Sequence, residues 1–471
     1  MNLIGLFFAP APMFSKLDYR DPRNISQSYQ MLDIMLTAQE IHDPGLMNRS
    51  LWVGQLFSED LSWEREDGLS VPVGVSAVGN DLALRAVLPF RFAFKKEFLY
   101  AYEEVNLFSG RTAFPGLRPW DPRHDPRWEI SSWDPQPIVG KQQLLEERQT
   151  RGYAGVLWDW GCLSVGREVL RLGPAYRYAM TQSGFAGPLD FFYNLSLRSE
   201  KLIFTAAFAR IPDTVDNRRL TLQRIDFMPF AWMSLAATEG VYSSRGDFAK
   251  YANPFLFFHD IQRHESDNQD NLFASAELSV IPVRGLRLYG EIFMDDPTFI
   301  SGGEAAQYAG MLGAHIALPY GEKLWSIRIE GAEASPYTYA HFSDSNAMSA
   351  MGWPMGYWLG PDARSVFVEM SLIRPVFSAG VWAEAWQHGQ LWITDAYEDS
   401  MKIITDWPTG VVETGVETGL RLGLNTGFLK AELLPGYYFG DNYQNTRGRT
   451  ISEFRVSASV EIRHPGAFVG F

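Results

Sequence analysis

Two short clusters of tryptophan and acidic residues have the composition of a sugar-binding surface. Aromatic rings stack on the C–H faces of sugars, and carboxylates accept hydrogen bonds from their hydroxyl groups. The same tryptophans are equally typical of the interfacial girdle of a membrane barrel, with the acids packed in its lumen. The clusters are therefore candidates for polysaccharide binding with a structural alternative. Their members are Trp158, Asp159 and Trp160 in the first, and Trp382, Glu384 and Trp386, which share one face of an expected strand, in the second.

Three further tryptophans, Trp120, Trp128 and Trp133, lie in a long proline-rich segment between Gly110 and Gly140. If this segment lies outside the cell, these rings are better placed to bind sugars than those on strands. If it lies in the periplasm or folds inward, they are structural.

Clustered carboxylates raise the question of catalysis. Asp295, Asp296 and Glu304 could be assigned to a metal site or to glycoside hydrolysis, which needs two carboxylates. Adjacent residues of a strand point to opposite faces, however, so we interpret these acids as strand-end residues at a turn. The eight histidines form no HxH or HExxH cluster, and no nucleophile elbow, Walker loop or dinucleotide fingerprint is present. We therefore expect no catalytic residue, no metal and no cofactor; a membrane-embedded glycan hydrolase is kept as a third class.

From about Val71 onward, apolar and polar residues alternate with the period of a β-strand. The polar faces carry mid-strand charges of both signs, as the wet interior of a barrel requires, while the apolar faces would meet lipid. The clearest segments are Leu272–Val280, Leu286–Met294, Trp325–Gly331, Val366–Leu372, Glu417–Leu424 and Phe454–Ile462. We expect seven charged residues to face the lumen and to pair with one another rather than bind a ligand. They are Arg167, Arg287, Glu291, Arg328, Glu330, Glu369 and Arg421.

A soluble antiparallel sheet would alternate in the same way, so the connections must decide between the two folds. Tight turns, such as those around Gly285 and Pro375, alternate with long connections rich in aromatic residues, glycine and proline, such as 335–362 and 394–412. Outer-membrane barrels sort short turns and long loops to opposite ends, whereas a sandwich has no reason to. We therefore predict an all-β fold, a closed antiparallel transmembrane β-barrel of about 16–18 strands, with a small N-terminal helical element.

Composition excludes some classes. The net charge of -14, from 41 basic and 55 acidic residues, argues against nucleic acid as a partner. Cys162 is the only cysteine, which excludes a disulfide framework and a thiolate metal site. No apolar run comes close to the length of about 18 residues that a transmembrane helix needs. Aromatic residues make up 14% of the chain, in keeping with both an interfacial girdle and a sugar-binding surface.

The N-terminal region differs from the rest. The apolar run Leu3–Phe8 resembles a remnant of an export signal, although a mature extension is the alternative. The segment Ile25–Ile41 has helical spacing and predicts a short amphipathic helix. We therefore divide the chain into residues 1–70, an export remnant and periplasmic helical element, and residues 71–471, the barrel. Phe471 is an aromatic C-terminal residue of the kind read by the barrel assembly machinery.

Four ordered blocks between Gly152 and Phe299 resemble the capsule assembly protein Wzi family. They are GREVLRLGPAYRYAMTQSG, LDFFYNLSLRSEKLIFTAAFARI, DFMPFAWMSLAATEGVYSSRGDFAKYANPFLFFH, and the pair DNQDNLFASAELSV and GLRLYGEIFMDDPTF. The first is similar to the family's "GR…WGPG" signature, and the last to its "lYgEf..DD" element. Leu172 stands where the signature has tryptophan, and Ala175 where it has a second glycine, so the sequence of this loop departs from the family's pattern at two positions.

The resemblance implies an outer-membrane barrel of a Gram-negative bacterium that acts as a surface lectin. Such a protein binds capsular or surface polysaccharide and helps to assemble or attach it, without enzymatic activity. Its expected partners are this polysaccharide, outer-membrane lipid and the barrel assembly machinery. Tyr176, inside the signature segment, joins the polysaccharide-binding candidates. The alternative function is a passive porin or substrate-specific channel, which would need an open lumen.

Overall fold

The computed structural model describes the barrel region and leaves out the N-terminal segment. The described residues are 70–78, 81–96, 98–110, 146–184, 186–212, 217–244, 250–263, 270–295, 307–321, 323–341, 343–350, 352–395, 406–426 and 429–463. The predicted helix at 25–41, the three tryptophans between Gly110 and Gly140, Asp296, Glu304 and Phe471 lie outside them, as does all but one residue of the predicted region 1–70.

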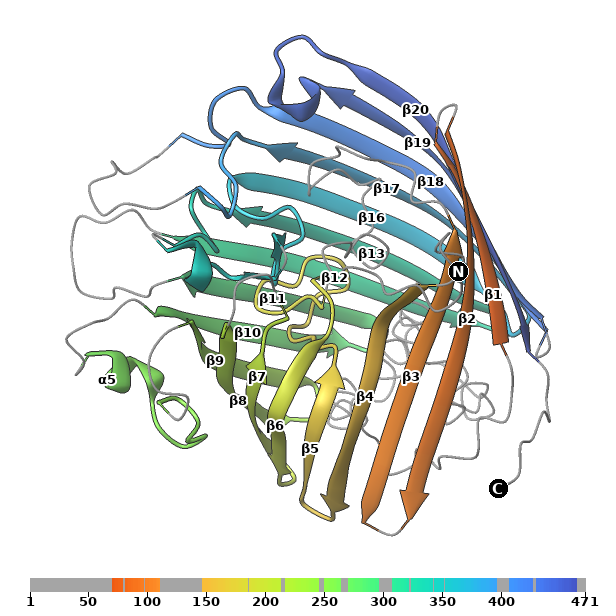
Figure 1. Cartoon of the computed structure of the whole chain (residues 1–471). Helices are drawn as coiled ribbons and strands as arrows, with labels where there is room; N and C mark the ends of the chain where they lie inside the picture. The colour runs from red at the N-terminus through yellow and green to blue at the C-terminus, as the bar shows by residue number, and fades with distance from the viewer. Residues whose placement is uncertain are drawn as a thin grey trace.

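Within these residues, eighteen long strands form one antiparallel sheet. Figure 1 shows them as tilted arrows around a common axis. The first nine are β1 (Ser70–Val78), β2 (Asp81–Lys96), β3 (Leu99–Gly110), β4 (Glu146–Trp158), β5 (Gly161–Glu168), β6 (Leu189–Arg198), β7 (Leu202–Arg210), β8 (Arg219–Phe230) and β9 (Met233–Ser243). The others are β10 (Asn271–Val283), β11 (Leu286–Asp295), β12 (Tyr308–Tyr320), β13 (Lys323–Ala334), β16 (Ala363–Ile373), β17 (Phe377–His388), β18 (Glu413–Asn425), β19 (Leu429–Asp441) and β20 (Ile451–Arg463).

The sheet closes on itself. Each strand pairs with the next along the chain, and β1 pairs with β20 in an antiparallel register that matches Val71 with Ile462 and Val78 with Arg455. The two strands lie side by side in Figure 1. The prediction of a closed antiparallel barrel is therefore confirmed, and the six segments with the clearest alternation all lie in its strands.

Apart from the two-residue connection between β1 and β2, short and long connections are sorted to the two ends of the barrel. Adjacent strands are joined by two or three residues at one end, as between β4 and β5 or β16 and β17. The other end carries long connections, including 169–188, 244–270, 335–362 and 389–412. In outer-membrane barrels the short turns lie in the periplasm and the long loops outside the cell, so we assign the two ends in this way.

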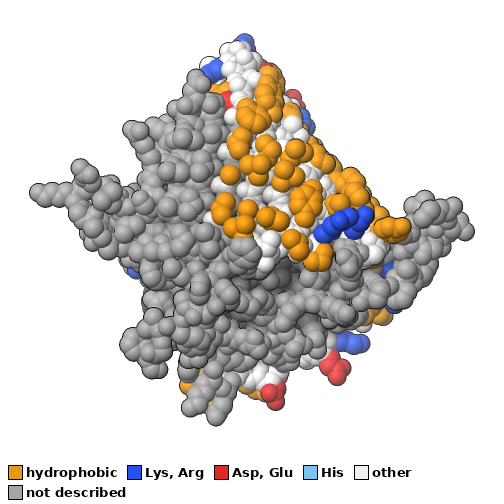
Figure 2. Space-filling view, turned by 90° about the vertical axis from the view of Figure 1, so that its right-hand side faces the viewer, with side chains coloured by type: hydrophobic (Ala, Val, Ile, Leu, Met, Phe, Trp, Pro, Cys, Tyr) orange, Lys and Arg blue, Asp and Glu red, His pale blue; other side chains and the backbone are white. Residues whose placement is uncertain are grey.

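The outer face is apolar although it is exposed, which is the reverse of a soluble protein. Figure 2 shows hydrophobic side chains gathered over one side of this surface. Lipid is the solvent that makes such a face stable, so the alternative of a soluble sheet is excluded. Exposed side chains of this face include Leu278, Ile292, Leu312, Ile329, Val366, Val368, Met370, Val381 and Leu420.

None of the helices in the described part of the chain has the length and apolar character needed to cross a bilayer.

Candidate functional site

The connection between β5 and β6 (169–188) packs against the inner wall. Leu172, Tyr178 and Met180 belong to one buried cluster with inward side chains of strands from β6 to β19. Gly173 has a φ of 106°, and a Cβ there would lie 2.7 Å from a carboxylate oxygen of Glu291. Only glycine fits so close to the wall in this conformation. This segment contains most of the signature-like block, which therefore lies in the lumen.

A second connection (335–362) joins it there. Its short strands β14 (Ser349–Ala350) and β15 (Trp353–Pro354) form a hairpin. The Tyr339 hydroxyl donates to the backbone oxygen of Met180 at 3.0 Å, and the Ser183 N–H donates to the backbone oxygen of Met355 at 2.8 Å. Gly356 approaches Met180 so closely that no side chain would fit between them. We call the two segments, 169–188 and 335–362, the plug.

The Glu330 carboxylate, on β13, holds the plug by its backbone. It accepts hydrogen bonds from the N–H groups of Tyr176, Arg177 and Tyr178 at 2.6, 2.7 and 3.1 Å. The Tyr289 hydroxyl donates to it at 2.5 Å. Hydrogen bonds to a charged group contribute about 1.5–3 kcal/mol each, roughly twice as much as neutral ones. Glu330 is therefore a tether between the wall and the plug.

Glu291, on β11, makes a second tether of the same kind. Its carboxylate accepts the N–H groups of Met180 and Thr181 at 3.0 and 2.8 Å, and the Thr181 hydroxyl at 2.5 Å. The side chain is 1% exposed. A buried carboxylate is costly unless several hydrogen bonds are donated to it. The plug supplies these donors to Glu291, and Glu291 supplies the acceptor that the plug N–H groups need.

Glu384, on β17, is the third tether. It accepts hydrogen bonds from Arg177 Nη2 and from the Tyr178 hydroxyl, both at 2.7 Å. Burial raises the pKa of the Tyr178 hydroxyl, and the nearby Glu384 charge raises it further, so the hydroxyl keeps its proton and donates. The Arg177 side chain is 36% exposed and its guanidinium lies 5.3 Å from the Trp358 ring centroid.

Tyr176 is held from two sides. The Arg328 guanidinium lies 3.9 Å from the centre of its ring, a cation–π contact, and Arg421 Nη1 donates to its hydroxyl at 3.3 Å. Trp382 and Tyr176 both pack against the buried cluster while staying partly exposed. Two predicted lumen charges thus contact a predicted polysaccharide-binding residue.

The other members of the predicted charge group have separate contacts. Glu369 and Arg421, two members of the group, pair at 3.7 Å. Arg167 pairs with Asp190, whereas Arg287 donates to the Ser279 hydroxyl at 2.7 Å. Glu291 and Glu330 instead accept hydrogen bonds from plug N–H groups, whereas the sequence analysis expected them to pair with other charged side chains.

The two predicted tryptophan clusters lie in different environments. Trp382, Glu384 and Trp386 share the inward face of β17, with Glu384 and Trp386 only 2% and 3% exposed. Trp158 is the last residue of β4, and Asp159 and Trp160 form the short turn to β5, at the end opposite the long loops. Trp160 is exposed and packs edge-on against Trp158 at 5.3 Å. Its end of the barrel carries further exposed aromatic residues at the strand ends and turns, as an interfacial girdle does: Phe98, Phe230, Trp232, Tyr320 and Phe377.

A buried cluster on β8 and β10 escaped the sequence analysis. The Arg224 guanidinium bridges Asp226 at 2.7 Å and the Glu277 carboxylate, and all three are nearly inaccessible to solvent. The inward face of β8 mixes leucine with these charges, so its alternation is not clean. The charged residues in an otherwise apolar strand face were the signal from which the sequence could have revealed this cluster.

At the long-loop end, two side chains tie separate loops together. The Asp362 carboxylate accepts the Thr409 N–H at 2.8 Å and its hydroxyl at 2.5 Å. Asn445 Nδ2 donates to the backbone oxygens of Gly389 and Val411, both at 2.9 Å. We call the segments joined here, 389–395, 406–412 and 442–450, together with Asp362, the outer platform. At its edge the Trp407 ring lies 6.4 Å from that of Tyr308, which is 37% exposed.

The predicted strand-end acid Asp295 also contacts the plug, since it accepts the Tyr339 N–H at 2.6 Å. Within the described ranges, no group of three or more histidine, cysteine or acidic side chains has the arrangement of a metal site.

Comparison with known proteins identifies the fold. No protein-family model and no curated protein match this chain. Among solved structures it is similar to Wzi of Escherichia coli, described as an outer-membrane protein involved in group 1 capsule assembly and a carbohydrate-binding β-barrel. That match has a TM-score of 0.56 and 14% identity and covers 92% of this chain and 89% of the other.

Two further solved structures match less well. OccD3 of Pseudomonas aeruginosa matches with a TM-score of 0.46 and 11% identity, over 84% of this chain and 91% of the other. A BenF-like porin of Pseudomonas fluorescens matches with a TM-score of 0.45 and 9% identity, over 85% of this chain and 99% of the other. The closed sheet with its exposed apolar face, and the fold shared with the Escherichia coli barrel, identify the chain as an outer-membrane β-barrel of the Gram-negative type.

Proposed function

We propose that this barrel binds surface polysaccharide outside the cell and helps to attach or assemble it, rather than serving as an open channel. The observation that supports this most directly is the plug. Glu291, Glu330 and Glu384 hold its backbone and side chains from three strands. A passive channel needs a wide aqueous path, and such tethers work against one.

The outer platform is the surface that we assign to the polysaccharide. Its loops are joined by Asp362 and Asn445, and a preorganised surface loses less conformational entropy when a ligand binds. Tyr308 and Trp407 offer aromatic faces at its edge, suited to stacking on sugar rings. The Escherichia coli barrel of similar fold is described as carbohydrate-binding, which agrees with this assignment.

We propose binding without catalysis. Hydrolysis of a glycosidic bond needs two carboxylates that face the substrate. The lumen carboxylates Glu291, Glu330 and Glu384 are instead occupied by plug donors. The polysaccharide, outer-membrane lipid and the barrel assembly machinery are the partners this proposal implies.

The proposal is tested by binding of the host's own surface polysaccharide to purified protein, with retention of that polysaccharide on a deletion strain as the cellular measurement. Tyr308→Ala and Trp407→Ala should each weaken binding about 3- to 10-fold, the value of one aromatic contact. The matched control is Tyr320→Ala, because Tyr320 lies at the short-turn end of the same strand as Tyr308 and is also exposed.

Binding that is absent from the wild-type protein, with normal retention on the deletion strain, would overturn the proposal. Equal weakening by Tyr320→Ala would show that the platform is not the binding surface. The alternative function, a channel, predicts instead that solute uptake falls in the deletion strain while polysaccharide retention is unchanged.

A further inference from the structure

Residues 250–263, in the connection between β9 and β10, fold over the outside of the barrel wall. Thr238 and Tyr242, on β9, face inward, since they contact Arg224 and Gln182. With the two-residue period of a strand, Glu239 and Val241 must point outward. Val241 is nonetheless fully buried, because Tyr251 and Phe258 of the connection cover it.

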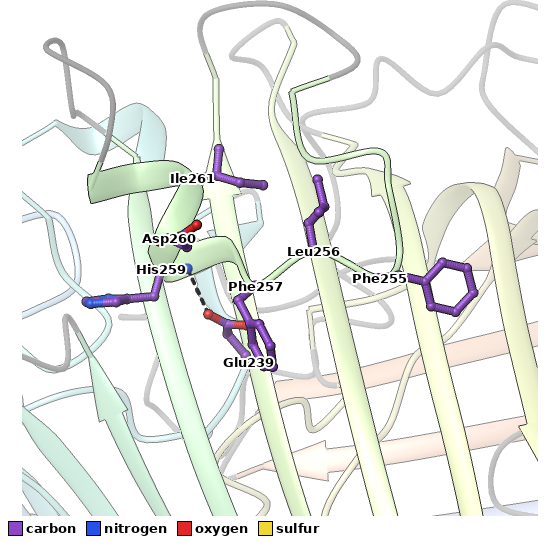
Figure 3. Close-up of a pocket in the computed structure, with 7 residues that line it drawn as sticks. All are labelled: Glu239, Phe255, Leu256, Phe257, His259, Asp260 and Ile261. Atoms are coloured by element: carbon purple, nitrogen blue, oxygen red, sulfur yellow. Dashed lines mark hydrogen bonds between the residues drawn. The ribbon is translucent and has the colours of Figure 1, made fainter.

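This connection also covers a carboxylate on the lipid side. Glu239 accepts the backbone N–H of His259, at the start of α5 (Phe258–Arg263), at 2.8 Å (Figure 3). Gln223, on β8, donates to Glu239 at 2.9 Å and to the backbone oxygen of Leu256 at 2.8 Å. An outward carboxylate is costly beside lipid unless donors surround it. The connection thus makes this part of the wall compatible with a membrane.

The same segment presents three consecutive apolar side chains to the outside. Phe255, Leu256 and Phe257 are 67%, 45% and 76% exposed. Phe255 stacks on Phe204 of β7, with ring centroids 5.7 Å apart and planes at 15°. The apolar run is therefore continuous with the lipid-facing side chains of the neighbouring strands, which include Phe192, Ile225 and Phe227.

A hollow of about 430 Å³ lies at this place, against the outer wall. Figure 3 shows Phe257 beside Glu239, with Ile261 and Leu256 above them. Its lining is apolar at the phenylalanines and polar at Glu239, His259 and Asp260. A lipid has the same division between an apolar chain and a polar end.

We infer that this hollow and the run Phe255–Phe257 form a binding site for an acyl chain of an outer-leaflet lipid. The site lies toward the long-loop end of β8 and β9, which is the level of the outer leaflet. Lipid is favoured over a second copy of the chain because the apolar run continues a surface that lipid already covers. The inference rests on the barrel fold and is independent of polysaccharide binding.

The test places a fluorescent probe on the run. Phe257→Cys is made in a Cys162→Ser background, labelled with an environment-sensitive fluorophore, and reconstituted in vesicles of phosphatidylcholine with brominated acyl chains. Leu312→Cys, on the exposed outer face of β12, is the lipid-contact control, and Arg447→Cys, exposed in the loop before β20, is the aqueous control. Cys162 is buried, so the background change leaves the outer surface intact.

We expect brominated lipid to quench the Phe257 probe by at least about half of the effect at Leu312, and more strongly when the bromines lie close to the headgroup. The Arg447 probe should be quenched by iodide in the water and not by brominated lipid. Quenching of the Phe257 probe by iodide alone would overturn the inference. A second outcome would also overturn the inference. If neither quencher affects the Phe257 probe and its emission changes with the protein-to-lipid ratio, a second copy of the chain covers the run.

Discussion

The Glu330 carboxylate accepts the backbone N–H of Tyr176 at 2.6 Å, across 154 residues of sequence. It also accepts the next two N–H groups along the plug, so one wall side chain fixes the conformation of a three-residue stretch. Backbone N–H groups in a lumen would otherwise need water or other acceptors. This relationship explains how a loop that follows a membrane strand can remain folded inside the barrel.

Removing the Glu330 charge should loosen the plug. In Glu330→Gln the new amide group places donors opposite donors, and we expect the free energy of unfolding to fall by about 1–3 kcal/mol. Thermal unfolding in detergent and proteolysis within 169–188 measure the effect. Glu333→Gln is the matched control, because Glu333 lies on the same strand with an exposed side chain. Equal stability of Glu330→Gln and the wild-type protein would contradict the tether.

Arg224 should be essential to the stability of the β8–β10 wall. Arg224→Met leaves the carboxylates of Asp226 and Glu277 buried without their cation, which should cost about 3–5 kcal/mol. Unfolding in urea measures this loss, and Arg210→Met, at an exposed strand end, is the control. If the cause is uncompensated charge, adding Asp226→Asn and Glu277→Gln should restore most of the stability, and a failure to do so would point to lost packing instead.

The outer platform should weaken as the pH rises. Burial raises the pKa of Asp362 above its usual value, although its hydrogen bonds to Thr409 and Leu391 oppose the shift. A raised folded-state pKa contributes stability that is fully present below the unfolded pKa and is lost as the pH rises through the folded value. Hydrogen exchange of the amides in 406–412 should therefore show more frequent opening above the folded-state pKa of Asp362 than below its unfolded-state pKa.

Asp362→Asn is the control for this pH dependence, because its side chain does not titrate. The slope of opening against pH should disappear in it. A slope that persists unchanged in Asp362→Asn would assign the dependence to another group.

The barrel itself could be predicted from sequence because its physical basis is local. In β16, Val366, Val368 and Met370 alternate with Phe367, Glu369 and Ser371, and the structure exposes the first set and buries Phe367 and Glu369. Lipid on one side and a crowded interior on the other require this two-residue period. The sorting of short and long connections then decided between a membrane barrel and a soluble sheet.

The plug could not be predicted in the same way. The two-residue period reveals which face of a strand Glu330 occupies, but not what lies opposite that face. The contact with Tyr176 depends on where a connection of twenty residues folds, which is set by distant packing around Tyr178 and Met180. Gly173 was the local feature that could have indicated this close approach, because its backbone conformation is one that other residues avoid.

Single-channel conductance in planar bilayers tests the central claim, that a tethered plug occupies the lumen, most directly. The wild-type protein should show no stepwise openings of porin size. A variant in which a short glycine–serine linker replaces residues 171–183 should show them, because β5 and β6 remain joined while the backbone held by Glu291 and Glu330 is gone. Porin-size openings of the wild-type protein, unchanged in this variant, would contradict the account.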